Sequence, residues 1–133
     1  MARNWAEHPT QLELEILNII WRDGPATVRH VRNALESTRD LAFTTVHTKM
    51  NVMVKKGFLA AERRGKGDGG TLYKAKVARR KTGRQLLRAL LAPLFGGSVT
   101  QAMQALMTGN GVDEEELRKL QLIVAKANKR RRK

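Results

Sequence analysis

Residues 44–57, TTVHTKMNVMVKKG, gather side chains that are able to do chemistry. Thr, His, Asn and Lys serve in active sites as proton donors, proton acceptors and hydrogen-bonding groups. The same side chains also hydrogen-bond to base edges and phosphates of nucleic acids. An active site would need a nucleophile, a base or a metal beside them. A surface that binds nucleic acid would need them exposed on one side of a helix or strand.

The rest of the sequence supplies no catalytic partner for this stretch. There are no cysteines, which excludes disulfides, thiolate catalysis and thiolate metal sites. His8, His30 and His47 stand far apart, and no Ser/His/Asp set or carboxylate pair can be assembled with any specificity. Residues 65–70 match the glycine fingerprint of dinucleotide sites, but a strand rather than a helix follows them. We therefore predict no enzyme, no metal and no cofactor.

The stretch is amphipathic at the period of an α-helix. Apolar side chains at i, i+4, i+7 and i+8 predict that one side packs into a core. They are Val46, Met50, Met53 and Val54. The candidate base-reading residues, which this leaves on the outside, are Thr44, Thr45, His47, Thr48 and Asn51. Taken alone, the helix could also be an ordinary amphipathic one with a polar outer face.

The surrounding elements predict a winged helix-turn-helix DNA-binding domain over residues 1–77. A capping box at Thr10 begins a first helix, Gly24-Pro25 stops it, and Thr27 caps a shorter second helix. Two short strands then flank the glycine-rich turn. In such a domain the third helix enters the major groove, while flanking residues meet phosphates. The candidate backbone contacts are Lys49, Lys55, Lys56, Arg63, Arg64 and Lys66.

Residues 78–133 predict a helical dimerisation domain. Glycines divide them into three short amphipathic helices, which have too little interior to be stable alone. We expect their apolar faces to meet those of a second chain; packing back on the first domain is the alternative. The candidate interface residues are Leu87, Leu90, Leu91, Leu94, Phe95, Val99, Met103, Leu106, Leu117, Leu120 and Val124. The predicted fold class is mainly α with a small β-hairpin.

The charge indicates a polyanionic partner. The 133 residues include 26 Lys and Arg against 12 Asp and Glu, a net charge of +14, which attracts nucleic acid first and anionic membrane second. No apolar run is long enough to cross a bilayer and the start has no apolar leader, so we expect a cytoplasmic protein without membrane insertion. The basic tail Lys129–Lys133 leaves an alternative open, a nucleoid or RNA-associated protein that binds nucleic acid without sequence preference.

Several segments together resemble the penicillinase repressor family, of BlaI/MecI type and with the copper-responsive CopY type. They are LELEILNIIW (12–21), ATVRHVRNAL (26–35), RDLAFTTVHTKMNVMVKKGFL (39–59), LYKA (72–75), FGGS and DEEELRKL. The resemblance implies a homodimeric winged-helix repressor that binds double-stranded DNA at an inverted-repeat operator and controls a resistance or stress-response operon. It implies Thr44, His47 and Thr48 as base readers, the C-terminal helices as the dimer clamp, and a membrane sensor-protease as a candidate partner.

Three departures from the family pattern bear on mechanism. Val52 stands where family members commonly carry a basic residue, so a phosphate contact is missing or has moved to Lys49. The antibiotic-responsive members are cleaved near an Asn-Phe pair, where this chain has Ala105-Leu106. The copper-responsive members use C-terminal cysteine pairs, which this chain lacks. The resemblance therefore leaves the operator sequence, the target genes and the inducing signal open.

Overall fold

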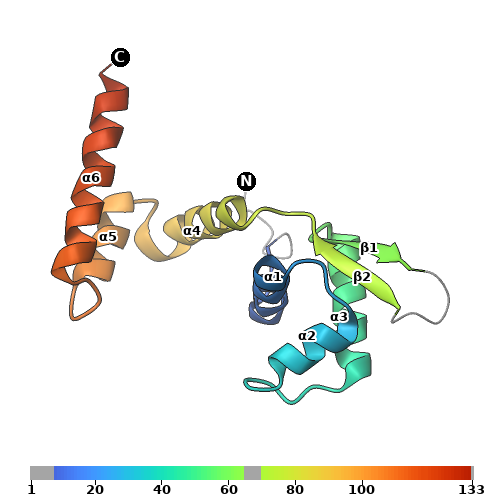
Figure 1. Ribbon diagram of the computed structural model, residues 1–133. Coiled ribbons are helices and arrows are strands. Elements are labelled where there is room, and N and C mark those ends of the chain that lie inside the picture. Colours follow the sequence, from blue (N-terminus) through green and yellow to red (C-terminus); the bar gives the residue numbers. More distant parts are fainter. Residues whose placement is uncertain (1–7, 65–69, 133) are drawn as a thin grey trace. The chain divides into compact units, whose positions relative to one another are not determined.

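Three helices and a hairpin follow one another in the predicted order (Figure 1). The structure is a computed structural model that describes residues 8–64 and 70–132. It divides the chain into two compact units, one up to Leu86 and one from Leu87 onwards. This division falls inside a helix, whereas the sequence pattern places the domain boundary after residue 77. The extent of each domain as an independent folding unit stays a prediction.

The helices of the first unit begin and end at local signals. They are α1 (Gln11–Asp23), α2 (Val28–Leu35) and α3 (Phe43–Lys56). The capping box at the start of α1 is complete, because Thr10 Oγ1 accepts from the Glu13 N–H at 3.2 Å and Glu13 Oε1 accepts from the Thr10 N–H at 2.8 Å. Thr27 Oγ1 caps α2 by accepting from the His30 N–H at 3.1 Å. Gly57 ends α3 at a φ of 88°, which glycine adopts without a steric penalty.

The hairpin is antiparallel and is tied to the helices by a short bridge. It consists of β1 (Leu59–Arg63) and β2 (Thr71–Ala75), with Leu59 opposite Ala75 and Arg63 opposite Thr71. Ala26, in the turn between α1 and α2, exchanges two backbone hydrogen bonds with Tyr73 at 2.9 and 2.8 Å. The hairpin is therefore anchored beside α2 and α3 as the wing of a winged helix.

One hydrophobic core holds these elements together. Each helix contributes one side, and the hairpin contributes the residues at its base. The core residues are Ile16, Leu17, Ile19, Ile20, Ala26, Val28, Val31, Leu35, Val46, Met50, Met53, Phe58, Leu59 and Tyr73. Outside it, the Trp21 indole N–H donates to the Val77 carbonyl at 3.0 Å and fixes the chain just before α4 (Arg79–Phe95). The predicted fold class, mainly α with a small β-hairpin, is confirmed.

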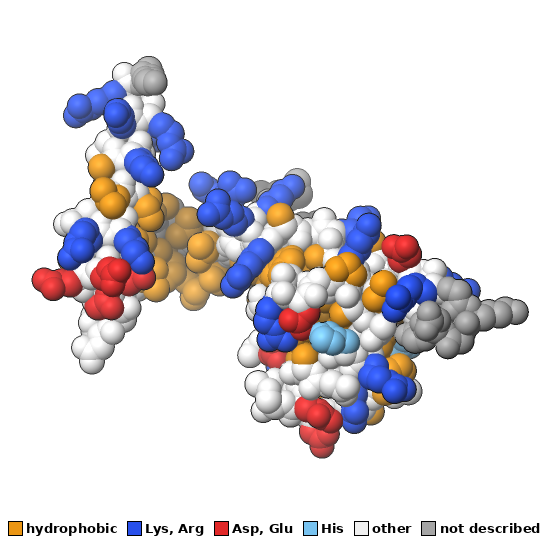
Figure 2. Space-filling view, viewed as in Figure 1, with side chains coloured by type: hydrophobic (Ala, Val, Ile, Leu, Met, Phe, Trp, Pro, Cys, Tyr) orange, Lys and Arg blue, Asp and Glu red, His pale blue; other side chains and the backbone are white. Residues whose placement is uncertain are grey.

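The second unit contains helical structure without an interior of its own. It holds the second half of α4, then α5 (Val99–Met107) and α6 (Glu114–Arg131), capped by Ser98 and Asp113. No side chain among the described residues 87–132 is buried. Hydrophobic side chains instead gather on the surface of α4 and α5 (Figure 2). No helix in the described part of the chain has the length and hydropathy of a membrane span.

Candidate nucleic-acid interface

The outer side of α3 is a row of polar side chains. Val46, Met50 and Met53 are buried, which fixes the rotation of the helix on the core. Thr44, Thr45, His47 and Thr48 are exposed on the remaining surface. At 100° per residue, Thr44 and Thr48 lie almost opposite the core residue Val46 and form the central ridge of this face.

Two hollows flank this ridge. One, of about 640 Å³, lies between α2, α3 and the hairpin, and His47 and Phe43 form its α3 wall. The other, of about 410 Å³, lies on the opposite flank and is lined by Leu12, Thr44, Thr45, Thr48, Lys49 and Val52. Val52 therefore gives an apolar patch to the second hollow. A ridge with a hollow on either side is the shape that a helix needs to enter a groove bounded by two strands.

A chain of polar contacts fixes the His47 flank of α3. The buried Tyr73 hydroxyl donates to Asn51 Oδ1 at 3.0 Å, and Asn51 Nδ2 lies 3.2 Å from His47 Nε2. The His47 ring in turn stacks on Phe43, with centroids 6.3 Å apart and ring planes 8° apart. Burial raises the pKa of Tyr73, so its hydroxyl stays protonated as a donor. Asn51, predicted to read bases, is half-buried and uses its amide inside the protein.

A buried carboxylate holds two of the lysines predicted to contact the DNA backbone. The side chain of Glu13 is 0% exposed, and its Oε2 accepts from Lys56 Nζ at 2.9 Å and lies 3.5 Å from Lys49 Nζ. Burial alone would raise the pKa of Glu13. The hydrogen bonds from Thr10 and Lys56 and the attraction of both lysines lower the pKa below its ordinary value. Glu13 is therefore a charged group that joins α1 to α3.

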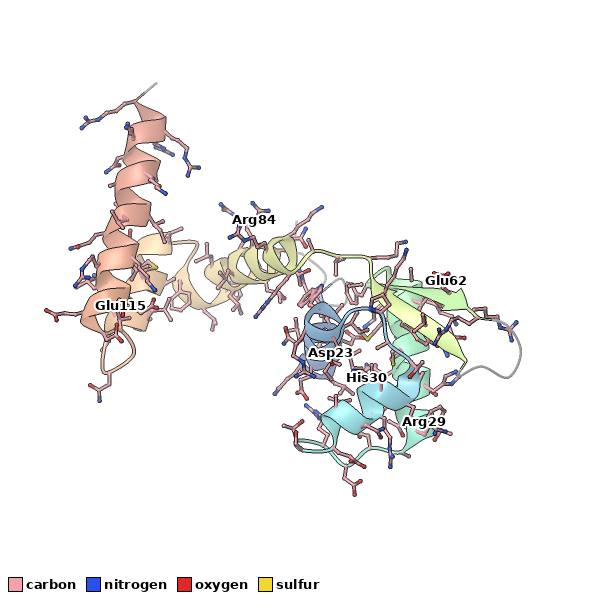
Figure 3. The ribbon with its side chains drawn as sticks, in the orientation of Figure 1. Asp23, Arg29, His30, Glu62, Arg84 and Glu115 are labelled. Carbon is pink, nitrogen blue, oxygen red and sulfur yellow. The ribbon has the colours of Figure 1, made fainter. Side chains whose placement is uncertain are left out.

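Two other ion-pair clusters lie in the first unit. At the end of α1, Asp23 accepts from Arg22 at 2.8 Å and lies 2.8 Å from His30 Nε2, a pairing visible in Figure 3. The hydrogen bonds from Arg22 and His30 strongly lower the pKa of Asp23. Arg39 donates twice to Glu15, at 2.9 Å each, and ties the turn before α3 to α1. Among the described residues no three His, Asp or Glu side chains could hold a metal ion.

Comparison with known proteins identifies the family. The penicillinase repressor pattern matches residues 9–126 of the chain. The chain belongs to the penicillinase repressor family. It is 30% identical over 128 residues, 96% of this chain and 85% of the other, to an uncharacterized 16.5 kDa protein from the ptsI 3′ region of Latilactobacillus sakei. It is also 43% identical over 49 residues, 36% of each chain, to the transcriptional regulator BlaI of Mycobacterium tuberculosis.

Penicillinase repressors are DNA-binding regulators of transcription, a family of regulators rather than enzymes. In this chain, Lys55, Arg63 and Arg64 are exposed and form no ion pair with the described residues. They are the predicted backbone contacts that remain available to a ligand, unlike Lys49 and Lys56. Lys66, also predicted to contact the backbone, lies outside the described residues. The assignment of base-reading and backbone roles stays a prediction.

Sequence reasoning missed Arg29 as a functional candidate. This exposed residue of α2 lines the hollow on the His47 flank of α3. The sequence around Arg29 predicts a short amphipathic helix and shows no binding motif. The sequence signal for it is its place in the first turn of the helix that precedes α3, which in helix-turn-helix proteins lies close to the DNA backbone.

Proposed function

We propose that this member of the penicillinase repressor family binds a palindromic DNA operator as a homodimer and represses transcription from it. The observation that carries the proposal is the outer side of α3, where exposed Thr and His side chains form a ridge between two hollows. An α-helix with its side chains is about 10–12 Å across and fits a major groove about 12 Å wide. The ridge then reaches base edges and the flanks face the two sugar-phosphate strands.

The residues on the ridge suit base recognition. The Thr44 and Thr48 hydroxyls are able to donate to or accept from base edges, and their methyl groups are able to pack on the thymine methyl. Both belong to the first half of α3, the part of a recognition helix that normally contacts bases. His47 adds a ring nitrogen at an orientation that Asn51 and Phe43 restrain.

The second unit supports a dimer. Large apolar side chains of α4, α5 and α6 are exposed in the single chain, including Leu87 at 66% and Leu106 at 61%. Exposed apolar surface of this extent is a feature of interaction sites. A two-fold dimer through these helices would present two α3 helices to half-sites roughly 34 Å apart. The proposed function includes no sensor-protease, because this chain has Ala105-Leu106 in place of the Asn-Phe pair near which antibiotic-responsive members are cleaved.

Footprinting on genomic fragments tests the proposal. We expect a discrete protected dyad whose occupancy falls steeply with salt. Thr48→Ala should lower discrimination between the dyad and a scrambled duplex about five- to tenfold, whereas Lys55→Ala should lower affinity for both duplexes alike. A smear of protection without a dyad would contradict sequence-specific binding.

Removal of the basic end of α6 tests the alternative function, which is nucleic-acid binding without sequence preference. Lys129, Arg130 and Arg131 form its last turn, where the helix dipole favours cations, so their charge also has a local role. If removal of Lys129–Lys133 abolishes nearly all DNA binding, the protein is a charge-driven binder without sequence preference. If the dyad footprint survives the removal, the specific repressor is supported.

A further inference from the structure

The hollow on the His47 flank of α3 is built by three elements of the first unit. Its lining comes from the start of α2, the start of α3 and the beginning of β2. The residues are Thr27, Val28, Arg29, Phe43, His47, Gly70, Thr71 and Tyr73. None of these side chains is acidic, and several carry hydrogen-bond donors. An anion would therefore meet no repulsive charge from these eight described residues.

Arg29 is the cation of this hollow. It is exposed, and its guanidinium forms no hydrogen bond or ion pair with the residues that the structure describes. The neighbouring arginines differ: Arg22 pairs with Asp23, Arg39 with Glu15, and Arg32 lies 3.7 Å from Glu36. Figure 3 shows Arg29 extending from α2 on a different side from His30, which turns towards Asp23. The Arg29 guanidinium is thus available to a ligand.

The first turn of α2 adds backbone donors at the same place. Thr27 uses its side chain and its carbonyl to satisfy the N–H groups of His30 and Val31. The preceding N–H groups of Val28 and Arg29 are the ones that an α-helix leaves without an intrahelical partner. These groups and the helix dipole favour an anion beside Arg29.

We propose that this hollow binds a phosphate of the DNA backbone and that Arg29 is the side chain that contacts it. The inference rests on the proposed function and adds a ligand site to it. A helix that lies in the major groove has a sugar-phosphate strand along each flank. On the opposite flank Lys49 is engaged by Glu13, whereas on this flank Arg29 is unpaired among the described residues. An Arg fork suits two phosphate oxygens.

Arg29→Gln tests the site, with Arg84→Gln as the matched control. Arg84 is an exposed arginine on α4 that lines none of the hollows beside α3, and it also forms no ion pair with the described residues (Figure 3). The probes are the dyad recovered by footprinting and a scrambled duplex of equal length. We expect Arg29→Gln to weaken binding to both duplexes about tenfold and to reduce the slope of log K against log salt by about one. Arg84→Gln should change the slope by less.

Neutral substitutes for single phosphates identify the phosphate that Arg29 contacts. Methylphosphonates are placed singly along the dyad, and each is measured with the wild type and with Arg29→Gln. We expect one position per half-site at which the substitution weakens the wild type but not the variant, because both changes remove the same contact. If Arg29→Gln binds like Arg84→Gln, or if no position couples to it, the phosphate site is wrong while the repressor function stands. If the wild type protects no dyad but Arg29→Gln still weakens binding to the scrambled duplex about tenfold and Arg84→Gln does not, only sequence-specific repression fails. If there is neither a dyad nor this weakening, both proposals fail.

Discussion

Tyr73 on β2 donates a hydrogen bond to Asn51 on α3 at 3.0 Å, across 22 residues of sequence. Tyr73 is 2% exposed and is also held by two backbone hydrogen bonds to Ala26. Its hydroxyl is therefore a fixed point from which the Asn51 amide is oriented. Asn51 in turn contacts His47, so the wing restrains the orientation of an exposed side chain on α3.

Tyr73→Phe should reduce DNA discrimination without unfolding the protein. The ring keeps its place in the core, and the loss of one hydrogen bond costs about 1 kcal/mol of unfolding free energy. His47 loses its restraint, so we expect a severalfold smaller ratio of dyad to scrambled-duplex affinity, with an unchanged salt slope. Competition binding on both duplexes measures this ratio.

Asn51→Ala is the partner variant for Tyr73→Phe. If the two residues act as one chain towards His47, the double variant should discriminate no worse than Asn51→Ala alone. Additive losses would show that Tyr73 and Asn51 act on DNA recognition separately. Rescue is also informative, since Asn51→Gln keeps an amide but moves it by one methylene and should restore little.

Glu13→Gln should destabilise the first unit and change its response to acid. Glutamine preserves the capping bond to Thr10 but removes the charge that Lys49 and Lys56 neutralise. We expect the free energy of unfolding at neutral pH to fall by about 1–3 kcal/mol. Because the folded pKa of Glu13 is lowered, its contribution is full above the ordinary value of 4.5 and is lost as pH falls below it.

Denaturant unfolding at several pH values measures how the stabilisation by Glu13 depends on pH. The difference between wild type and Glu13→Gln should shrink as the solution is acidified below 4.5, because the carboxyl is neutralised first in the unfolded chain and then, at its lower folded pKa, in the native protein. Glu62→Gln is the control, since Glu62 is exposed and forms no ion pair with the described residues. A stability difference for Glu13→Gln that stays constant with pH would argue against the charge as its cause.

Lys55 and Lys56 are adjacent and should respond oppositely to alanine. Lys56 neutralises the buried Glu13, so Lys56→Ala should lower the unfolding free energy by about 1–3 kcal/mol. Lys55 is exposed and unpaired among the described residues, so Lys55→Ala should change stability by less than about 0.5 kcal/mol and should weaken binding to any duplex. Thermal unfolding and duplex binding, both measured on the two variants, separate the roles. Equal losses of affinity without loss of stability would show that Lys56 leaves Glu13 to bind DNA.

Local patterns in the sequence predict the framework of the outer side of α3. The spacing of Val46, Met50 and Met53 was enough to tell which side of α3 is buried, because helical periodicity depends only on neighbouring residues. The caps at Thr10 and Thr27 were predicted for the same reason. The fold class followed from the order of these elements, and the exposed positions of Thr44, Thr45, His47 and Thr48 followed from the rotation of α3.

The sequence does not predict which polar side chains contact one another. Glu13 and Lys56 lie 43 residues apart, and nothing near either one indicates the other. Periodicity separates buried from exposed sides but does not say which polar residues at the boundary meet. Asn51 lies at such a boundary, which is why it was assigned to the outer face although its amide bonds to Tyr73. Local patterns do not indicate a role for Arg29, because its place in the hollow depends on the start of α2 lying beside the start of α3.

Val124→Glu should dissociate the proposed dimer. At 100° per residue, Val124 shares one side of α6 with Leu117 and Leu120, and it is 60% exposed in the single chain. If this side meets a second chain, a carboxylate there would be desolvated without a partner, at a cost of several kcal/mol. Sedimentation equilibrium should show a monomer, and affinity for the dyad should fall far more than affinity for a single half-site.

Leu122→Glu is the matched control for this prediction. Leu122 is also 60% exposed, but it lies on the other side of α6, about 140° from Leu117. The two variants therefore add the same charge to equally exposed apolar positions of one helix and differ only in the side they alter. We expect Leu122→Glu to remain dimeric and to bind the dyad like the wild type. Dissociation by Leu122→Glu but not by Val124→Glu would place the interface on the opposite side of α6, and dissociation by neither would argue against α6 as part of the dimer.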